Sequence, residues 1–353
     1  IGSAVTEDLS ADFTVVGMDM EPSEDGSKPD DFVQCDLTDD DSVQTALTNI
    51  RAKHGPRIAS VIHLAAYYDF AGEPSEMYDK LTVEGTRRLL RELQEFQVEQ
   101  FVFSSTILVM EPADEEDEKI TESSPLEDEP WDYPRSKIRT EQLLFNERGR
   151  IPIVILRIAG VYDENTHAVP IAQHISRIYE EQFESYFYPG DKTHGQAFVH
   201  LDDLVECIRR VVQLRSRLPE TDIFIVAEPD LMSYRELQNT IGELVHGEEW
   251  TTIWIPKFMA KAGAWAQENI LGDETFIKPW MIDIADDNYP VAITHARNSL
   301  NWEPKHRLRN TLPKMVGKLK QDPREWYEIN GLDPPDDLKV QEEEKGRSKE
   351  AFF

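Results

Sequence analysis

Short apolar runs alternate along the first half of the chain with longer stretches in which apolar residues recur every three or four positions. Strand, helix and strand at this spacing are typical of parallel strands joined by crossover helices. The pattern therefore predicts an α/β chain with a Rossmann-like, doubly wound parallel sheet. The predicted strands are residues 13–16 (extended to residue 19), 32–34, 60–64, 100–104 and 152–157, and the predicted helices are residues 41–53, 78–95 and 133–147.

The second half of the chain has a less regular pattern. It predicts a strand that enters a helix over residues 198–214 and a further strand at residues 222–226. Helices are predicted at residues 233–245 and 311–320. Elements of the sheet therefore return after an interruption, which predicts a smaller C-terminal substrate-binding domain between them.

The domain organisation follows from this change of pattern. We expect residues 1–165 to form an NAD-binding, Rossmann-like domain, with sheet elements returning near residues 197–226. Residues 166–330 are expected to be mainly substrate-binding. Residues 331–353 contain many Pro, Asp, Glu and Lys residues and few large apolar ones, which predicts a solvated tail.

The chain opens at Ile1-Gly2, directly at the pattern of a helix start. A dinucleotide-binding fold places a strand and a glycine-rich turn before this helix, and the sequence contains neither. Gly2 matches the last glycine of such a turn, where a missing side chain lets helix and strand pack closely. Loss of a mid-sheet strand would leave buried backbone groups unpaired, at about 1–3 kcal/mol each. We therefore expect that the sequence has lost its beginning, with a rearranged fold as the alternative.

The charge balance restricts the partners. The chain has 37 basic and 68 acidic residues and a net charge of −31. Nucleic acids and anionic membrane surfaces are bound by clustered Lys and Arg, so both are disfavoured. No apolar run approaches the ~18 residues that span a bilayer. The two cysteines, Cys35 and Cys207, have no metal-type spacing, and we expect a cytoplasmic protein with a small-molecule substrate and no nucleic-acid, membrane or metal partner.

The strongest local motif is Tyr133-Pro134-Arg135-Ser136-Lys137. A Tyr and a Lys four residues apart share one face of a helix. A phenol with a pKa of ~10 is a poor base at neutral pH, but a neighbouring ammonium lowers that pKa. The pair can then take a proton from a substrate hydroxyl while the carbon gives hydride to a nicotinamide. Taken alone, the motif equally fits a surface Tyr and Lys on an amphipathic helix.

The context of this motif favours the catalytic interpretation. The apolar strand before it ends in three hydroxyl side chains, Ser104, Ser105 and Thr106. Ligands of open α/β sheets bind at the carboxyl ends of strands, so a hydroxyl there can hold a substrate oxygen toward the phenol. A turn that is simply rich in Ser and Thr is the alternative.

Two aspartates follow the first two predicted strands. Asp19 is placed to accept hydrogen bonds from the ribose hydroxyls of NAD and to repel the extra phosphate of NADP. An ordinary turn aspartate is the alternative. Asp36 follows the next strand and is placed to approach the adenine edge, with helix capping as its alternative.

In this order and spacing the chain resembles the extended short-chain dehydrogenase/reductase family, also called the NAD-dependent epimerase/dehydratases. The resemblance extends over most of the chain. The matching positions are Gly2, Asp19 and residues 35–37, 61–66, 83–86, 104–106, 133–137, 156–157, 198–203 and 301–304.

The resemblance implies roles for these residues and NAD as cofactor. Thr106 corresponds to the Ser/Thr of the catalytic triad, Tyr133 to its acid/base, and Lys137 to the residue that lowers the phenol pKa and holds the nicotinamide ribose. His200 and Asp203 correspond to a structural pair. The implied cofactor-binding residues are Gly2, Asp19, Asp36, Leu37, Leu64, Ala65, Ala66, Ser104, Tyr133, Lys137 and Ile158.

Three positions depart from the family pattern besides the missing turn. Thr82 replaces an Asn that supports the fold by a hydrogen bond. Gly160 stands where nucleotide-sugar members have an Asn, and Gln196 where they often have an Arg that pairs with diphosphate. A diphosphate without a matched cation forfeits charge-assisted hydrogen bonds of ~1.5–3 kcal/mol each. A nucleotide-sugar substrate is therefore only the family default.

We therefore expect an NAD-dependent oxidoreductase, epimerase or dehydratase that acts on a sugar or another alcohol or carbonyl compound. A dinucleotide-binding sensor without chemistry is an alternative, although the presence of both Tyr133 and Lys137 disfavours it. An inactive fragment that lacks its phosphate-binding turn is another. The resemblance also implies a homodimer that pairs through the helix bearing Tyr133.

Overall fold

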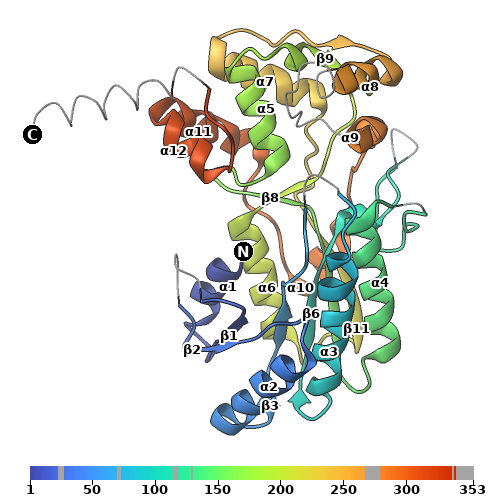
Figure 1. The fold of residues 1–353 in the computed structure, drawn as a ribbon, viewed down its shortest axis with the longest axis vertical. Helices are drawn as coiled ribbons and strands as arrows, with labels where there is room; N and C mark the ends of the chain where they lie inside the picture. The colour runs from blue at the N-terminus through green and yellow to red at the C-terminus, as the bar shows by residue number, and fades with distance from the viewer. Residues whose placement is uncertain are drawn as a thin grey trace, which may run out of the picture. The chain divides into compact units, whose positions relative to one another are not determined.

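The protein is described by a computed structural model in which its chain forms two compact units (Figure 1). Unit 1 comprises residues 1–159, 201–229 and 289–305, and unit 2 comprises residues 160–200, 230–288 and 306–353. The tail predicted at residues 331–353 lies mostly outside the described residues. The structure describes residues 1–22, 28–69, 73–113, 118–128, 130–266, 279–335 and 338.

Unit 1 is built on parallel strands, which confirms the predicted α/β fold class. Four strands pair in the order β11-β7-β6-β4. Their bounds are β4 (Val61–His63), β6 (Phe101–Thr106), β7 (Ile153–Ile158) and β11 (Thr221–Val226). Shorter parallel ladders join β1 (Val16–Asp19) to β2 (Asp31–Gln34) and β3 (Arg57–Ile58) to β5 (Gln97–Val98). Among the described strands, none pairs with both β1 and β4.

Helices cover both faces of this sheet (Figure 1). Phe101 and Phe103 alternate along β6 toward one face, where they pack with Leu90 and Leu144. Because this core fixes β6 beneath two neighbouring helices, the hydroxyl residues at the end of the strand lie next to the start of α4. The helices on this face are α2 (Asp40–His54), α3 (Glu84–Leu93) and α4 (Asp132–Glu147), and those on the other are α1 (Gly2–Leu9), α6 (Leu201–Leu214) and α10 (Thr294–Leu300).

The structure corrects the start of the first predicted strand. Residues 13–16 were expected to begin it, but β1 begins only at Val16. The amide of Phe13 still donates to the carbonyl of Leu9 (3.0 Å), so the chain is completing the turn that follows α1. The amide of Val15 donates to the carboxylate of Asp30 (2.8 Å) and not to a strand.

The helix predicted at residues 78–95 is also different, because it opens as a π-helical turn. This turn, η1 (Tyr78–Val83), leads directly into α3. The hydroxyl of Thr86 donates to the carbonyl of Thr82 (2.6 Å), and the hydroxyl of Thr82 accepts from the amide of Tyr67 (2.9 Å). Side-chain hydroxyls thus take part in hydrogen bonding that a regular helix would satisfy through its backbone alone.

Unit 2 is mainly helical, and its core contains Ile171, Ile241 and Leu312 together with Trp326. Two short parallel ladders join β8 (Gly160–Tyr162) to β10 (Phe198–His200) and β9 (Phe187–Tyr188) to β12 (Ile253–Trp254). The helices are α5 (Val169–Tyr179), α7 (Tyr234–His246), α8 (Lys257–Ala266), α9 (Pro279–Asp283), α11 (Leu308–Gln321) and α12 (Pro323–Ile329), with short turns η2 (Ile107–Val109) in unit 1 and η3 (Phe183–Tyr186) and η5 (Ile284–Asp286) in unit 2. No helix in the described part of the chain combines the length and apolar character needed to cross a bilayer.

Candidate active site

The first two turns of α4 bring Tyr133 and Lys137 to the carboxyl end of β6. Lys137 is buried, with 2% of its surface exposed, and its Nζ donates to the carbonyl of Ser104 (2.7 Å). The same Nζ lies 4.8 Å from the centre of the Phe103 ring and 5.8 Å from that of Tyr133. The ammonium is therefore held between the strand backbone and two aromatic faces, and it does not lie on the outer surface of the helix.

Thr106 is the third residue that the geometry brings to this point. It is the last residue of β6, and its hydroxyl accepts from the amide of Leu108 (3.3 Å) at the start of η2. The Thr106 side chain also lies near the phenol of Tyr133 and acts to lower its pKa. Three residues named from two sequence motifs thus lie near one another within unit 1.

Burial changes the proton affinity of both titratable members of this group. It raises the pKa of Tyr133 to about 12, and the neighbouring Thr106 side chain opposes this rise. It lowers the pKa of Lys137 to about 7, and the nearby Glu141 carboxylate opposes this fall. Two such neighbours titrate as a pair, so we expect the pair to release its first proton near neutral pH.

Glu141 is a residue of this site that the sequence analysis missed. Its carboxylate accepts from Arg157 on β7 at 3.2 and 2.8 Å and from the hydroxyl of Ser105 on β6 at 2.5 Å. The two charged side chains are only 4% and 2% exposed. A Glu four residues after Lys137 lies on the same helix face, so the spacing could have placed Glu141 at the site, although not its contact with Arg157.

Two aromatic side chains border the phenol of Tyr133 and were not predicted either. The ring of Tyr68 meets that of Tyr133 edge-on, with centres 4.8 Å apart. The ring centre of Trp131, which precedes α4, lies 5.5 Å from that of Tyr133. Tyr68 follows β4 closely in the sequence. The segment after β4, which was predicted to contact the cofactor, therefore also places an aromatic ring against Tyr133.

Ser104 and His63 tie β6 to β4. The hydroxyl of Ser104 donates to the carbonyl of His63 (3.1 Å). The His63 ring is buried, and its Nε2 lies 2.8 Å from the hydroxyl of Thr86. Burial lowers the pKa of His63 to about 3, so the imidazole is neutral. This is the environment of a packed strand residue.

Asp19 and Asp36 lie at the carboxyl ends of β1 and β2, next to each other at one edge. One oxygen of the exposed Asp19 accepts from the amide of Met20 (2.7 Å). Asp36 accepts from the amide and the hydroxyl of Thr38 (2.8 and 2.7 Å), and these bonds lower the pKa of its carboxyl. Asp39 caps α2, so the capping alternative for Asp36 does not hold.

The other predicted cofactor residues differ in their surroundings. Leu64 and Ala66 are half-buried after β4, and Ala65 is exposed. Ile158 ends β7. Leu37 is buried against Gly85, where an added Cβ would lie 3.1 Å from the Leu37 side chain.

Gly2 stands apart from this group. A Cβ added at Gly2 would meet no atom of this chain within 4 Å, so the role expected for this glycine stays a prediction. The carboxyl edge of the strands offers acids, a buried ammonium and hydroxyls, which fit the riboses and nicotinamide of NAD. The described residues do not include a glycine-rich turn of the kind that binds the pyrophosphate in dinucleotide-binding folds.

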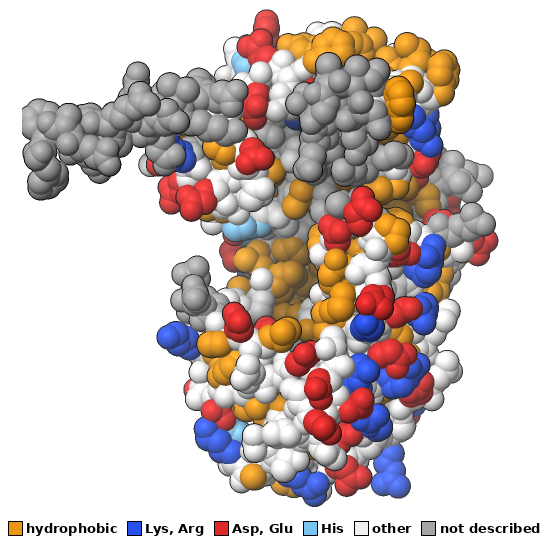
Figure 2. Space-filling view, in the orientation of Figure 1, with side chains coloured by type: hydrophobic (Ala, Val, Ile, Leu, Met, Phe, Trp, Pro, Cys, Tyr) orange, Lys and Arg blue, Asp and Glu red, His pale blue; other side chains and the backbone are white. Residues whose placement is uncertain are grey.

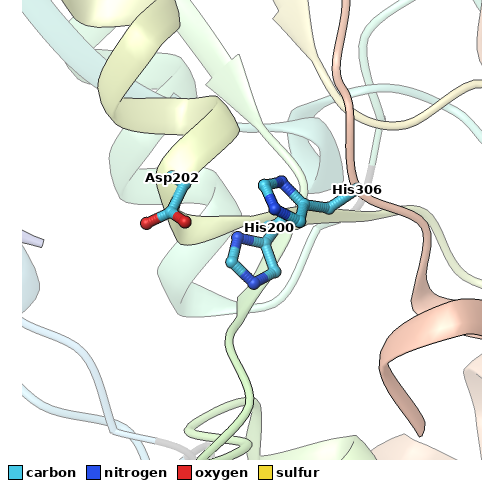
Figure 3. A group of neighbouring side chains, drawn as sticks. All are labelled: His200, Asp202 and His306. Atoms are coloured by element: carbon cyan, nitrogen blue, oxygen red, sulfur yellow. The ribbon is translucent and has the colours of Figure 1, made fainter.

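The histidine predicted to be structural, His200, packs in unit 2. Figure 3 shows its ring face to face with that of His306, with centres 3.9 Å apart and planes inclined by 19°. Its Nε2 lies 3.3 Å from a carboxylate oxygen of Glu164. Because imidazole lone pairs lie in the ring plane, two stacked rings cannot both direct them at one metal ion. Asp202, also drawn, belongs to the first turn of α6.

Comparison with known proteins places this geometry in context. The profile of the NAD dependent epimerase/dehydratase family matches residues 1–227. A search of curated protein sequences found no match.

Solved structures agree with the fold. The UDP-glucose 4-epimerase of Thermotoga maritima, solved with UDP-glucose, is 20% identical with a TM-score of 0.65, over 91% of this chain and 95% of that one. The UDP-glucose 4-epimerase of Thermus thermophilus, solved with NAD, is 20% identical with a TM-score of 0.64, over 91% and 96%. An epimerase of Methanothermobacter thermautotrophicus is 19% identical with a TM-score of 0.66, over 93% and 91%. At these identities the similarity establishes the fold and not the substrate.

Proposed function

The chain belongs to the NAD dependent epimerase/dehydratase family, and we propose that it oxidises a secondary hydroxyl of a sugar or another small alcohol with Thr106, Tyr133 and Lys137 as its proton-transfer group. The observation that carries this proposal is the burial of Lys137 beside Tyr133 at the end of β6, where Thr106 is the last strand residue. Burying an ammonium costs free energy because the charge loses its hydration. Buried titratable groups with shifted pKa values are concentrated at functional sites.

In the proposed reaction Tyr133 accepts the proton of the substrate hydroxyl. NAD, when bound, supplies the hydride acceptor. Thr106 holds the substrate oxygen next to the phenol, and Lys137 stabilises the phenolate electrostatically. In an epimerisation or dehydration the hydride is later returned, and Tyr133 then gives the proton back.

The proposed cofactor contacts follow the strand ends. Asp19 binds the adenosine ribose through its carboxylate, which favours NAD over NADP. Ser104 and Lys137 border the nicotinamide ribose, and Leu64 to Ala66 with Ile158 line the cofactor. A sugar substrate is supported by the family, whereas Gln196 and Gly160 do not reproduce the diphosphate contacts of nucleotide-sugar members.

The first test is reduction of NAD by the full chain with a panel of sugars, nucleotide sugars and simple alcohols, followed by Thr106→Val. The valine keeps the shape of Thr106 but removes the hydroxyl, so we expect kcat to fall by about 10-fold or more, in line with the loss of one oriented hydrogen bond. Thr106→Ser retains the hydroxyl and should remain within a few-fold of the parent. Equal rates for the valine and serine variants would contradict the role of Thr106.

The pH dependence of alcohol oxidation gives a second prediction. Burial lowers the pKa of Lys137 to about 7, so below that pH the pair is fully protonated and cannot accept a proton. We expect kcat/KM to rise with pH up to about 7 and then to level off. In Lys137→Arg the guanidinium stays charged and Tyr133 must release the first proton, so the rising limb should move to higher pH. A limb at the same pH in both proteins would contradict the assignment.

A further inference from the structure

Helix α8 of unit 2 turns its apolar side toward solvent. Phe258, Met259 and Trp265 are 72, 52 and 60% exposed. A surface helix of a globular protein normally packs this side against the core. The arrangement in α8 is therefore reversed, and it requires an explanation.

Ion pairs hold α8 in this orientation. The Nζ of Lys257 lies 2.7 Å from a carboxylate oxygen of Asp286 and donates to the carbonyl of Asp283 at 2.7 Å. The Nζ of Lys261 lies 2.5 Å from a carboxylate oxygen of Asp283. The lysine side chains of α8 thus face the neighbouring helix α9 and turn η5, and Phe258 and Met259 remain exposed.

The exposed apolar surface continues beyond α8. Ile253 and Trp254 of β12, just before the helix, are more than half exposed. Ile253 is the ladder partner of Phe187, whose ring centre lies 4.8 Å from that of the exposed Phe183. We call this surface the α8 patch, and Figure 2 shows hydrophobic side chains gathered over α8 and β9. The α8 patch consists of Phe183, Ile253, Trp254, Phe258, Met259 and Trp265.

We propose that the α8 patch docks the protein on the surface of an electrically neutral lipid bilayer. Trp and Phe are the side chains that insert at the boundary between headgroups and acyl chains, where interfacial helices bury an apolar side by ~5–10 Å. The sequence of α8 contains no acid, and both of its lysines are already paired with aspartates. The apolar side can therefore enter the interface without desolvating an unpaired charge of α8.

Charge favours this occupant over two others. The chain carries a net charge of −31, which opposes contact with a second copy and with an anionic membrane. A bilayer of zwitterionic lipid has no net charge to repel it. The sequence argument against a membrane partner concerned anionic surfaces and spanning helices, and a peripheral contact with neutral lipid is compatible with both observations.

The test is co-sedimentation of the full chain with phosphatidylcholine vesicles. We expect binding that the double variant Trp254→Ser/Phe258→Ser weakens by at least 10-fold, since each fully buried large apolar side chain changes affinity by roughly that factor. Ile329→Ser is the matched control, because Ile329 is an exposed apolar residue of α12 in the same unit, outside the α8 patch. It should bind as the parent does, and both variants should keep the parental melting temperature because all three side chains are exposed.

The same experiment can overturn the proposal. Absence of sedimentation with phosphatidylcholine, or equal sedimentation of the parent and the double variant, would refute it. Stronger binding to vesicles that contain phosphatidylserine would assign the contact to electrostatics and not to the α8 patch. Self-association that the double variant abolishes, without vesicle binding, would identify a second copy as the occupant.

Discussion

Tyr133→Phe is expected to lower kcat by about 10²–10⁴-fold while leaving the affinity for NAD essentially unchanged. The phenyl ring can keep its contacts with Tyr68 and Trp131, so the site retains its shape. Only the oxygen that would accept the substrate proton, which lies near Thr106, is lost. Steady-state rates of NAD reduction and the Kd of NAD from calorimetry measure the two effects separately.

Tyr68→Phe is the matched control for this experiment. It removes a hydroxyl from the adjoining ring and preserves the edge-on contact, and the proposed proton path does not include it. Its turnover should stay within a few-fold of the parent. Turnover that survives in Tyr133→Phe, or is lost equally in both variants, would exclude Tyr133 as the acid/base.

Glu141→Leu is expected to lower the free energy of unfolding by about 3–5 kcal/mol. The substitution leaves the guanidinium of Arg157 buried, with 4% of its side chain exposed, and without its bidentate carboxylate partner. It also removes the acceptor of the Ser105 hydroxyl. Unfolding in guanidinium chloride, followed by circular dichroism, measures the loss.

Two comparisons isolate the buried charge as its cause. Glu147→Leu alters an exposed ion pair with Arg87 at the end of the same helix, and it should cost no more than about 1 kcal/mol. The double variant Glu141→Leu/Arg157→Leu removes both charges and should be more stable than Glu141→Leu alone. A double variant as unstable as the sum of the single ones would show that packing, and not the unpaired charge, sets the penalty.

Hydrophobic patterning predicted the core of unit 1 well because its strands are buried and its helices are amphipathic. Phe101 and Phe103, in a run that ends in hydroxyl residues, identified β6 and the edge at which Thr106 meets Tyr133. The spacing of Tyr133 and Lys137 placed both on one side of α4, and in the structure the Lys137 ammonium bonds β6 and lies 5.8 Å from the centre of the Tyr133 ring.

Other features depend on contacts between segments far apart in the sequence. In the sequence, Glu141 resembles an ordinary surface residue of a helix, and Arg157 lies in a strand. The two form an ion pair only because α4 and β7 are adjacent in the fold. Helix α8 was not predicted, because its apolar side is exposed and does not pack against the core. Its orientation depends on ion pairs of its lysines with Asp283 and Asp286, which lie on later elements. The aromatic wall of Tyr68 likewise depends on the path of the chain after β4.

The π-helical turn η1 sets the rotational position of the residues that precede it about the axis of α3. A π turn accommodates one residue more than the α-helical turn it replaces. Deleting a residue within Tyr78–Val83 would restore regular winding and rotate the preceding residues by roughly 100° about the helix axis. Such a rotation would carry the buried ring of Tyr78 away from Tyr67, whose ring centre now lies 4.8 Å from it. The length of this segment, and not only its residue types, is therefore a constraint on the chain's natural variation.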